Sequence, residues 1–154
     1  MAAARSFLLD TNIVLHATRK NSPLSMAVEA QFGLKLSGVQ PAVCEVTVAE
    51  LWAFTRSQKW GDARTQLLRE IIAGMLVLPI SLPNVHQRWS ELYSHARSNG
   101  LAIQQDHNDI WIAAVAGLSR LTLLSTDRAA FRPLRGTSWL DVIVLDARTG
   151  AVLP

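Results

Sequence analysis

The chain has 154 residues, 49% of them hydrophobic and 18% charged. This length suits one domain with its own core, and the composition excludes a disordered, collagen-like or acidic-tail protein. The 15 basic residues, 12 of them arginine, exceed the 12 acidic ones by 3. That surplus is too small to identify an anionic partner by itself. We therefore expect a single domain over residues 1–154.

The sequence offers no membrane span and no secretory signal. The longest uncharged stretch, Ile71–Gln87, contains Pro79 and Pro83 and falls short of the ~20 apolar residues that a span requires. Near the start of the chain, Phe7–Leu9 is too short an apolar run for a signal peptide. Cys44 is the only cysteine, so a disulfide within the chain is impossible. These features favour a cytoplasmic protein.

The first predicted elements are one strand and two helices. Phe7–Leu9 is short and apolar, as a buried strand is. The three residues Asp10–Asn12 favour a helix N-terminus, which predicts a helix to about Thr18. Ser22-Pro23 supplies a cap and a first-turn proline for a second helix, which we expect to reach about Leu36.

The middle of the chain predicts two strands and two helices. A strand is expected near Ala42–Val46, and Thr47 is expected to cap a helix over residues 48–57. A further helix begins at Gly61-Asp62 and ends near residue 74. The third strand is expected over Met75–Ser81.

The last third predicts helices over Leu82–Ser98 and His107–Gly117, with Asn99-Gly100 closing the first of them. Two more strands are expected, Leu121–Thr126 and Asp141–Asp146. Strands that alternate with helical segments are typical of parallel sheets with helical crossovers. The predicted class is therefore α/β, as a three-layer α/β/α domain with a mostly parallel central sheet.

Carboxylates stand at positions where this fold binds ligands. Asp10 and Asp127 each follow a predicted strand directly, at the carboxyl edge of the sheet. Either aspartate alone is explained equally well as a helix cap. Glu50 lies on a segment that is apolar nearly all round, where an unpaired charge is costly. Arg56 and Lys59 are too far along that helix to pair with it.

Asp109 repeats the pattern of Glu50 on a helix rich in small residues, which pack closely on a sheet. Asp106 is better explained as an acid favoured by the helix dipole. Asn12 and Thr126 lie beside two of the acids, where their side chains can orient waters or carboxylates. Three arginines follow Asp127 closely enough to contact RNA phosphates, namely Arg128, Arg132 and Arg135.

Four carboxylates at one sheet edge repel one another and raise their pKa values unless a cation lies among them. Oxygen ligands favour Mg²⁺, or alternatively Mn²⁺, over zinc. Such an ion activates water and neutralises the leaving oxygen of a phosphodiester. We therefore predict a metal-dependent nuclease in which Asp10, Glu50 and Asp109 position the ion, and Asp127 completes the site or holds a second ion or a water.

Four segments carry a resemblance that runs through almost the whole chain. They are Leu8–Asn12, Thr47–Leu51, Asn108–Ala114 and Leu124–Asp127. In this order they resemble the PIN-domain ribonucleases, and among those the VapC-type toxins of bacterial toxin–antitoxin pairs. Two features depart from the family pattern, because Trp111 is bulky where a smaller aliphatic residue is expected and Asp106 is an additional acid that can serve as a supplementary ligand.

The resemblance implies a Mg²⁺-dependent endoribonuclease that inhibits translation or growth. It implies the acidic cluster of Asp10, Glu50, Asp109 and Asp127, with Thr126 as its hydroxyl neighbour. It also implies a homodimer and inhibition by a small antitoxin protein that covers the active-site groove.

Other readings of the sequence stay open. A haloacid-dehalogenase-type phosphatase also places an aspartate after its first strand, but Asn12 stands where its second aspartate is needed. A catalytically silent RNA-binding or regulatory module is the alternative, although all four acids are present. Of the four dispersed histidines only His107, near Asp109, merits a test. Most tryptophans are expected in the core, with Trp52 and Trp60 as candidates to meet a partner.

Overall fold

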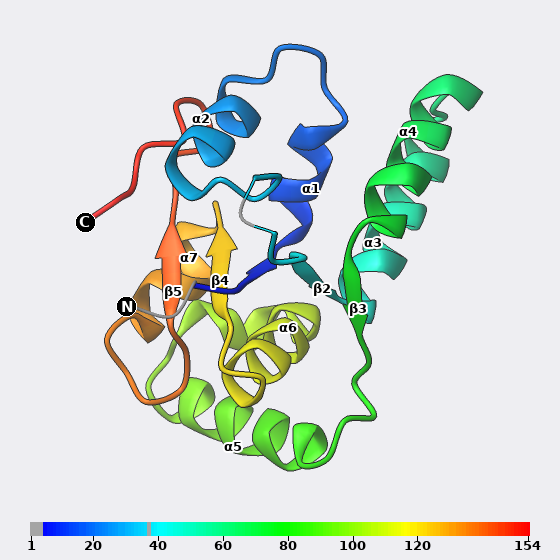
Figure 1. The fold of residues 1–154 in the computed structure, drawn as a ribbon. Coiled ribbons are helices and arrows are strands. Elements are labelled where there is room, and N and C mark those ends of the chain that lie inside the picture. Colours follow the sequence, from blue (N-terminus) through cyan, green and yellow to red (C-terminus); the bar gives the residue numbers. More distant parts are fainter. Residues whose placement is uncertain (1–4, 37) are drawn as a thin grey trace.

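The computed structural model describes residues 5–36 and 38–154 (Figure 1). Residues 1–4, which belong to the stretch considered for a signal peptide, and residue 37 lie outside the described part. Five strands form one sheet, in which every pair of neighbours is parallel. Their order across the sheet is β3-β2-β1-β4-β5. The strands are β1 Phe7–Leu9, β2 Ala42–Cys44, β3 Leu76–Leu78, β4 Thr122–Ser125 and β5 Val142–Val144.

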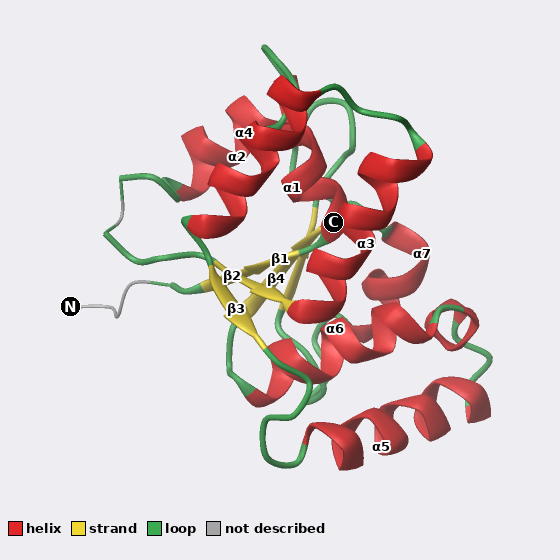
Figure 2. Ribbon diagram, turned by 90° about the vertical axis from the view of Figure 1, so that its right-hand side faces the viewer, coloured by secondary structure: helices red, strands yellow, loops and turns green. Residues whose placement is uncertain are grey.

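Helices cover both faces of the sheet, which gives the three layers that the sequence predicted (Figure 2). The helices are α1 Thr11–Ala17, α2 Pro23–Phe32, α3 Glu45–Ser57, α4 Asp62–Ala73, α5 Val85–Ser98, α6 His107–Leu118 and α7 Arg128–Phe131. Two 3₁₀ turns, η1 Ala102–Gln105 and η2 Arg132–Leu134, complete the described elements. The α/β class is confirmed.

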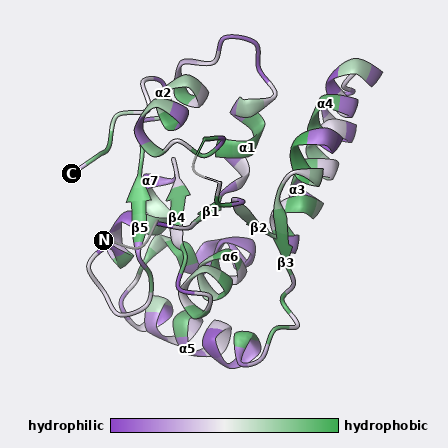
Figure 3. Ribbon diagram, viewed as in Figure 1, coloured by the Kyte–Doolittle hydropathy of each residue, from purple (hydrophilic) through white to green (hydrophobic). Residues whose placement is uncertain are grey.

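The strands separate two hydrophobic clusters because successive side chains point to opposite faces. Phe7 and Leu9 of β1 pack with residues of α1 to α4, whereas Leu8 packs with residues of α5 to α7. β5 is hydrophobic along its length, and α5 alternates between hydrophobic and hydrophilic residues (Figure 3). This contrast is typical of buried parallel strands that amphipathic helices cover.

Several predicted boundaries were wrong for local reasons. α2 ends four residues early, because Gly33 adopts a left-handed conformation with φ +58° and closes the helix on the carbonyl of Glu29. Thr47 does not cap α3, which begins directly after Cys44. Instead Thr47 is buried in the first turn, and its hydroxyl has no hydrogen-bond partner in the described part of the chain. The short elements α7, η1 and η2 were not predicted.

The sequence predicted no membrane span, and the length and composition of the described helices agree with that prediction. Within residues 5–36 and 38–154, no helix has both the length and the apolar character to cross a bilayer.

Gly117 of α6 lies against the backbone that leads into β5. A Cβ at this position would overlap the carbonyl oxygen of Trp139. That backbone continues into buried Leu140 and Val142 and cannot easily move. We expect Gly117→Ala to lower the free energy of unfolding by about 1–3 kcal/mol, the usual cost of overpacking, as measured by urea denaturation. Gly74→Ala meets only ordinary contacts and should change the same free energy by less than about 1 kcal/mol.

Candidate active site

Four carboxylates from separate elements gather at the carboxyl edge of the sheet. Asp10 follows β1 and Asp127 follows β4, and these two strands are neighbours. Glu50 lies on α3, which packs against α1 and α6, and Asp109 lies in the first turn of α6. The charges of Asp10, Asp127 and Glu50 all act on Asp109. The fold therefore brings together four acids that are far apart in the sequence.

Asp10 is the most buried of the four, with an exposed fraction of 5%. Its Oδ1 accepts a hydrogen bond of 2.8 Å from the backbone N–H of Thr11, and its Oδ2 accepts one of 2.6 Å from the hydroxyl of Ser125. Burial raises the pKa of Asp10 to about 6, although both hydrogen bonds favour the ionised form. The charges of Glu50 and Asp127 make smaller contributions to the same rise.

Glu50 is half-buried, and neutral donors rather than a cation contact its carboxylate. The hydroxyl of Thr11 donates to Oε1 over 2.8 Å, and the side chain of Asn108 supplies a second hydrogen bond. Burial raises the pKa of Glu50, the two hydrogen bonds lower it, and the charge of Asp106 raises it. The two hydrogen bonds therefore offset only part of the cost of burying the charge of Glu50.

The pKa of Asp109 is raised further above its ordinary value than that of Asp10. Burial first, and then the charges of Asp10, Asp106, Asp127 and Glu50, raise its pKa to about 8. In the protein without a cation, this carboxyl group therefore holds a proton near neutral pH.

Ser125 joins two of the acids. Its hydroxyl donates to Asp10 and accepts the backbone N–H of Asp127 over 2.9 Å. The sequence interpretation gave the role of hydroxyl neighbour to Thr126, but the contact to Asp10 is made by Ser125. The register of β1 and β4 pairs Leu9 with Leu124, which puts the next residues of the two strands side by side. A predicted register would have identified Ser125.

Asp127 and Asp106 both cap helices. Oδ1 of Asp127 accepts the N–H of Ala130, so this residue caps α7 while its charge also acts on Asp10 and Asp109. Oδ1 of Asp106 accepts the N–H of Asn108 and caps α6. This is the explanation that the sequence favoured for Asp106.

The remaining polar residues singled out in the sequence lie around this edge or away from it. Asn12 is exposed on the first turn of α1, and Arg128 and Arg132 are exposed just after Asp127. Arg135 lies apart from these residues, near the C-terminal segment. Its guanidinium donates a hydrogen bond of 3.0 Å to the carbonyl of Leu153. It also lines a cavity with Asp141, which precedes β5 at the opposite edge of the sheet.

Trp111, which departs from the family pattern, packs on the side of α6 that faces α5. Its ring lies 5.4 Å from that of Trp89 and 5.7 Å from that of His86, between centroids. His107 contacts the rings of Trp89 and Tyr93. The bulky side chain of Trp111 therefore packs among aromatic rings, and His107 packs against two rings of the same group.

The donor chemistry of the four acids fits a hard cation, but their side chains do not form a finished cage. Among the described residues, no three His, Cys, Asp or Glu side chains converge closely enough to hold one metal ion. Mg²⁺ commonly uses only one or two carboxylates and keeps several waters. Burial is the largest cause of the raised pKa values of Asp10 and Asp109, and the neighbouring acids raise them as well, with no cationic side chain among the described residues lowering them. A divalent cation is therefore compatible with the site.

Removing the Ser125 hydroxyl tests its contact with Asp10. We expect Ser125→Ala to raise the pKa of Asp10 by about 1–2 pH units above its value of about 6, because a hydrogen bond to a charged group contributes about 1.5–3 kcal/mol. Carbon-13 NMR titration of the carboxyl group measures this change. Thr126→Ala is the matched control, and an equal effect of both variants would contradict the assignment to Ser125.

Comparisons with known proteins cover the same elements. The family model described as PIN domain matches residues 7–135, a span that contains all four acids. "Ribonuclease VapC5" of Mycobacterium tuberculosis (strain ATCC 25618 / H37Rv) is 32% identical over 104 residues, which are 66% of this chain and 74% of that protein.

Solved structures show the same fold. VapBC2 from Rickettsia felis, bound to a DNA fragment from its promoter, aligns with a TM-score of 0.75 and 21% identity over 91% of this chain and 98% of its own. VapBC-5 from Mycobacterium tuberculosis, a member of a family of toxin–antitoxin systems, aligns with a TM-score of 0.67 and 25% identity. That alignment covers 93% of this chain and 100% of the other.

Proposed function

Because this chain belongs to the PIN-domain family, we propose that it is a Mg²⁺-dependent endoribonuclease and the toxin of a toxin–antitoxin pair. It hydrolyses RNA phosphodiesters in the cytoplasm and so inhibits translation or growth. The observation that carries this proposal is that Asp10, Glu50, Asp109 and Asp127 lie at one edge of the sheet, near enough for the charges of the other three to act on Asp109. The relative with 32% identity, a ribonuclease by name, supports the same activity.

Asp10, Glu50 and Asp109 would hold the cation, Mg²⁺ or alternatively Mn²⁺, and Asp127 would complete the site. When bound, the cation supplies positive charge that offsets the negative charge developing on the phosphate oxygens.

The protein's own groups keep the acids in position. Ser125 and the N–H of Thr11 fix the two oxygens of Asp10, and the hydroxyl of Thr11 fixes one oxygen of Glu50. Partners of this kind, which orient ligands without touching the substrate, typically change activity 10–100-fold when removed. Arg128 and Arg132, exposed beside Asp127, are the cations we propose for contacts with RNA phosphates.

The experiment that tests this function is cleavage of total cellular RNA by the purified protein with Mg²⁺, with a chelator, and with Asp10→Ala under the same conditions. We expect discrete fragments that require both the metal and Asp10. RNA that stays equally intact with both proteins, at every metal tested, would favour the catalytically silent RNA-binding module instead.

We also propose that a small antitoxin protein binds and inhibits this chain, as the solved toxin–antitoxin relatives suggest. A cavity of about 620 Å³ between α1, α2 and α4 offers an apolar surface for it, with Ile13, Val14, Val28, Leu34 and Met75 in its lining. Co-expression with any small reading frame found directly upstream of the gene, followed by size-exclusion chromatography, tests this partner. The same chromatography of the chain alone tests the homodimer, which stays a prediction.

A further inference from the structure

Two arginines come together at the end of α1 that lies away from the acids. Arg19 follows the C-cap of α1, and Arg64 lies in the first turn of α4. The guanidinium carbon of Arg64 sits 3.7 Å above the centroid of the Trp60 ring. Its Nε and Nη2 lie 3.4 and 3.3 Å from the hydroxyl oxygen of buried Thr18. Stacking and hydrogen bonding therefore hold the Arg64 guanidinium in place before any ligand arrives.

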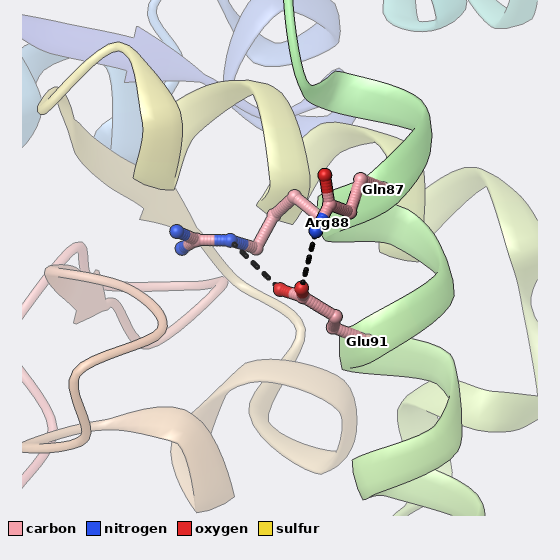
Figure 4. A network of polar contacts seen from close by, with 3 residues as sticks. All are labelled: Gln87, Arg88 and Glu91. Atoms are coloured by element: carbon pink, nitrogen blue, oxygen red, sulfur yellow. Dashed lines mark hydrogen bonds and ion pairs between the residues drawn. The ribbon is translucent and has the colours of Figure 1, made fainter.

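These arginines have no acidic partner in the described part of the chain. Among residues 5–36 and 38–154, one ion pair is found, and it joins Arg88 to Glu91 on α5 (Figure 4). The side chain of Gln87 also donates a hydrogen bond to Glu91. The positive charge of Arg19 instead acts on Arg64 and His16. Burial and then the charge of Arg19 lower the pKa of Arg64, and the same two causes lower the pKa of His16.

Two neighbouring cations repel one another, and an anion bound between them relieves that repulsion. The planar fork of arginine matches the oxygens of a phosphate group, and Lys20 and Lys59 flank the pair in the sequence and are exposed. We propose that Arg19 and Arg64 bind a backbone phosphate of the RNA at a position several nucleotides from the cleaved bond. This inference rests on the proposed function.

The position of the pair fits one strand that also reaches the acids. α1 begins beside Asp10 and runs toward Arg19, which is eight residues beyond Thr11. At 1.5 Å per residue this is about 12 Å, the length of about three or four stacked nucleotides at 3.4 Å each. A single strand with its cleaved bond at the acids can therefore extend along α1 to the two arginines.

Binding measured apart from cleavage tests the inference. In an Asp109→Asn background, fluorescence anisotropy of a labelled single-stranded oligoribonucleotide of mixed sequence is recorded over a range of KCl concentrations. Arg19→Gln, Arg64→Gln and the double variant are compared with Arg97→Gln, which removes an exposed cation from α5. A dinucleotide, too short to reach from the acids to the arginines, serves as the second probe.

We expect the double variant to weaken binding of the long probe by about tenfold, the loss of one charge-assisted contact. The slope of log affinity against log salt should fall by about 0.7, the value for one phosphate on a single strand. Binding of the dinucleotide should stay unchanged, and Arg97→Gln should leave the slope as it is. Arg64→Lys, which keeps the charge but loses the stacked fork, should weaken binding less than Arg64→Gln.

A double variant that behaves like Arg97→Gln overturns the inference. So does a double variant that still binds RNA normally but no longer binds polyglutamate, because the surface then serves an acidic protein. If Arg64→Gln does not fold, as circular dichroism would show, exposed Arg19→Gln decides the question. A wild-type protein that neither binds nor cleaves RNA refutes the proposed function as well, whereas one that cleaves RNA while the double variant binds it normally refutes only this inference.

Discussion

The cation-free protein should lose thermal stability as the pH rises from about 4 to about 9. Asp10 and Asp109 have pKa values of about 6 and about 8 in the folded state, against 3.8 for an ordinary aspartate. The folded state therefore binds their protons more tightly than the unfolded chain does. This contribution to stability is complete below 3.8 and is lost as the pH passes through about 6 and then about 8.

For Asp10, which is almost fully buried, the loss is about 2–3 kcal/mol at 1.36 kcal/mol for each pH unit. That free energy corresponds to a fall in Tm of about 5–10 °C for a chain of this size. Differential scanning fluorimetry in chelator measures it. If the acids hold a cation, adding Mg²⁺ should raise Tm at pH 8 and leave it nearly unchanged at pH 5, whereas an equal effect at both pH values would count against a cation site at these carboxylates.

Asp109→Asn should abolish RNA cleavage and at the same time raise the Tm of the cation-free protein at pH 8 by several degrees. Above its pKa of about 8, Asp109 carries a charge that is partly desolvated and is repelled by four other acids. Asparagine keeps the shape and removes that charge. Below about pH 3.8 the aspartate is protonated in both the folded and the unfolded state, so wild type and variant should melt alike there. The measurements are Tm in chelator at several pH values and fragment yield with Mg²⁺.

Asp106→Asn is the matched control on the same helix. Asparagine caps a helix N-terminus as well as aspartate does, and Asp106 is exposed, so its Tm should change little at any pH. Cleavage by this variant should stay within about tenfold of wild type. A stabilisation as large as that of Asp109→Asn would mean that general charge reduction, rather than the buried site, explains the effect.

The spacing of hydrophobic residues, together with the positions of capping and turn residues, predicted the architecture of the fold. Apolar runs such as Phe7–Leu9 identify buried strands, and the alternation of strands with helical segments identifies a parallel sheet with helices on both faces. The positions of Asp10 and Asp127 after two such strands then predict their edge of the sheet. Their metal-binding and catalytic roles stay predictions.

Local sequence could not reveal contacts that depend on register and packing. The choice of Ser125 over Thr126 depends on how β1 aligns with β4. Arg135 is only eight residues from Asp127, yet η2 carries the chain back to the opposite edge of the sheet. α3 begins at Glu45, three residues before the predicted start, with Cys44 as its N-cap and no side-chain capping hydrogen bond, so the capping preference of Thr47 did not locate the start of this helix.

The central place of β1 in the sheet determines how late in synthesis the proposed active site forms. β1 is made first, but its partner β4 and the residues that hold Asp10 come more than 110 residues later, as the 115-residue separation of Asp10 and Ser125 shows. A ribosome adds roughly 5–20 residues per second, so the nascent chain exists for several seconds with its acids apart. The complete set of carboxylates assembles only when nearly the whole chain has left the ribosome, so the proposed nuclease site is absent from shorter nascent fragments.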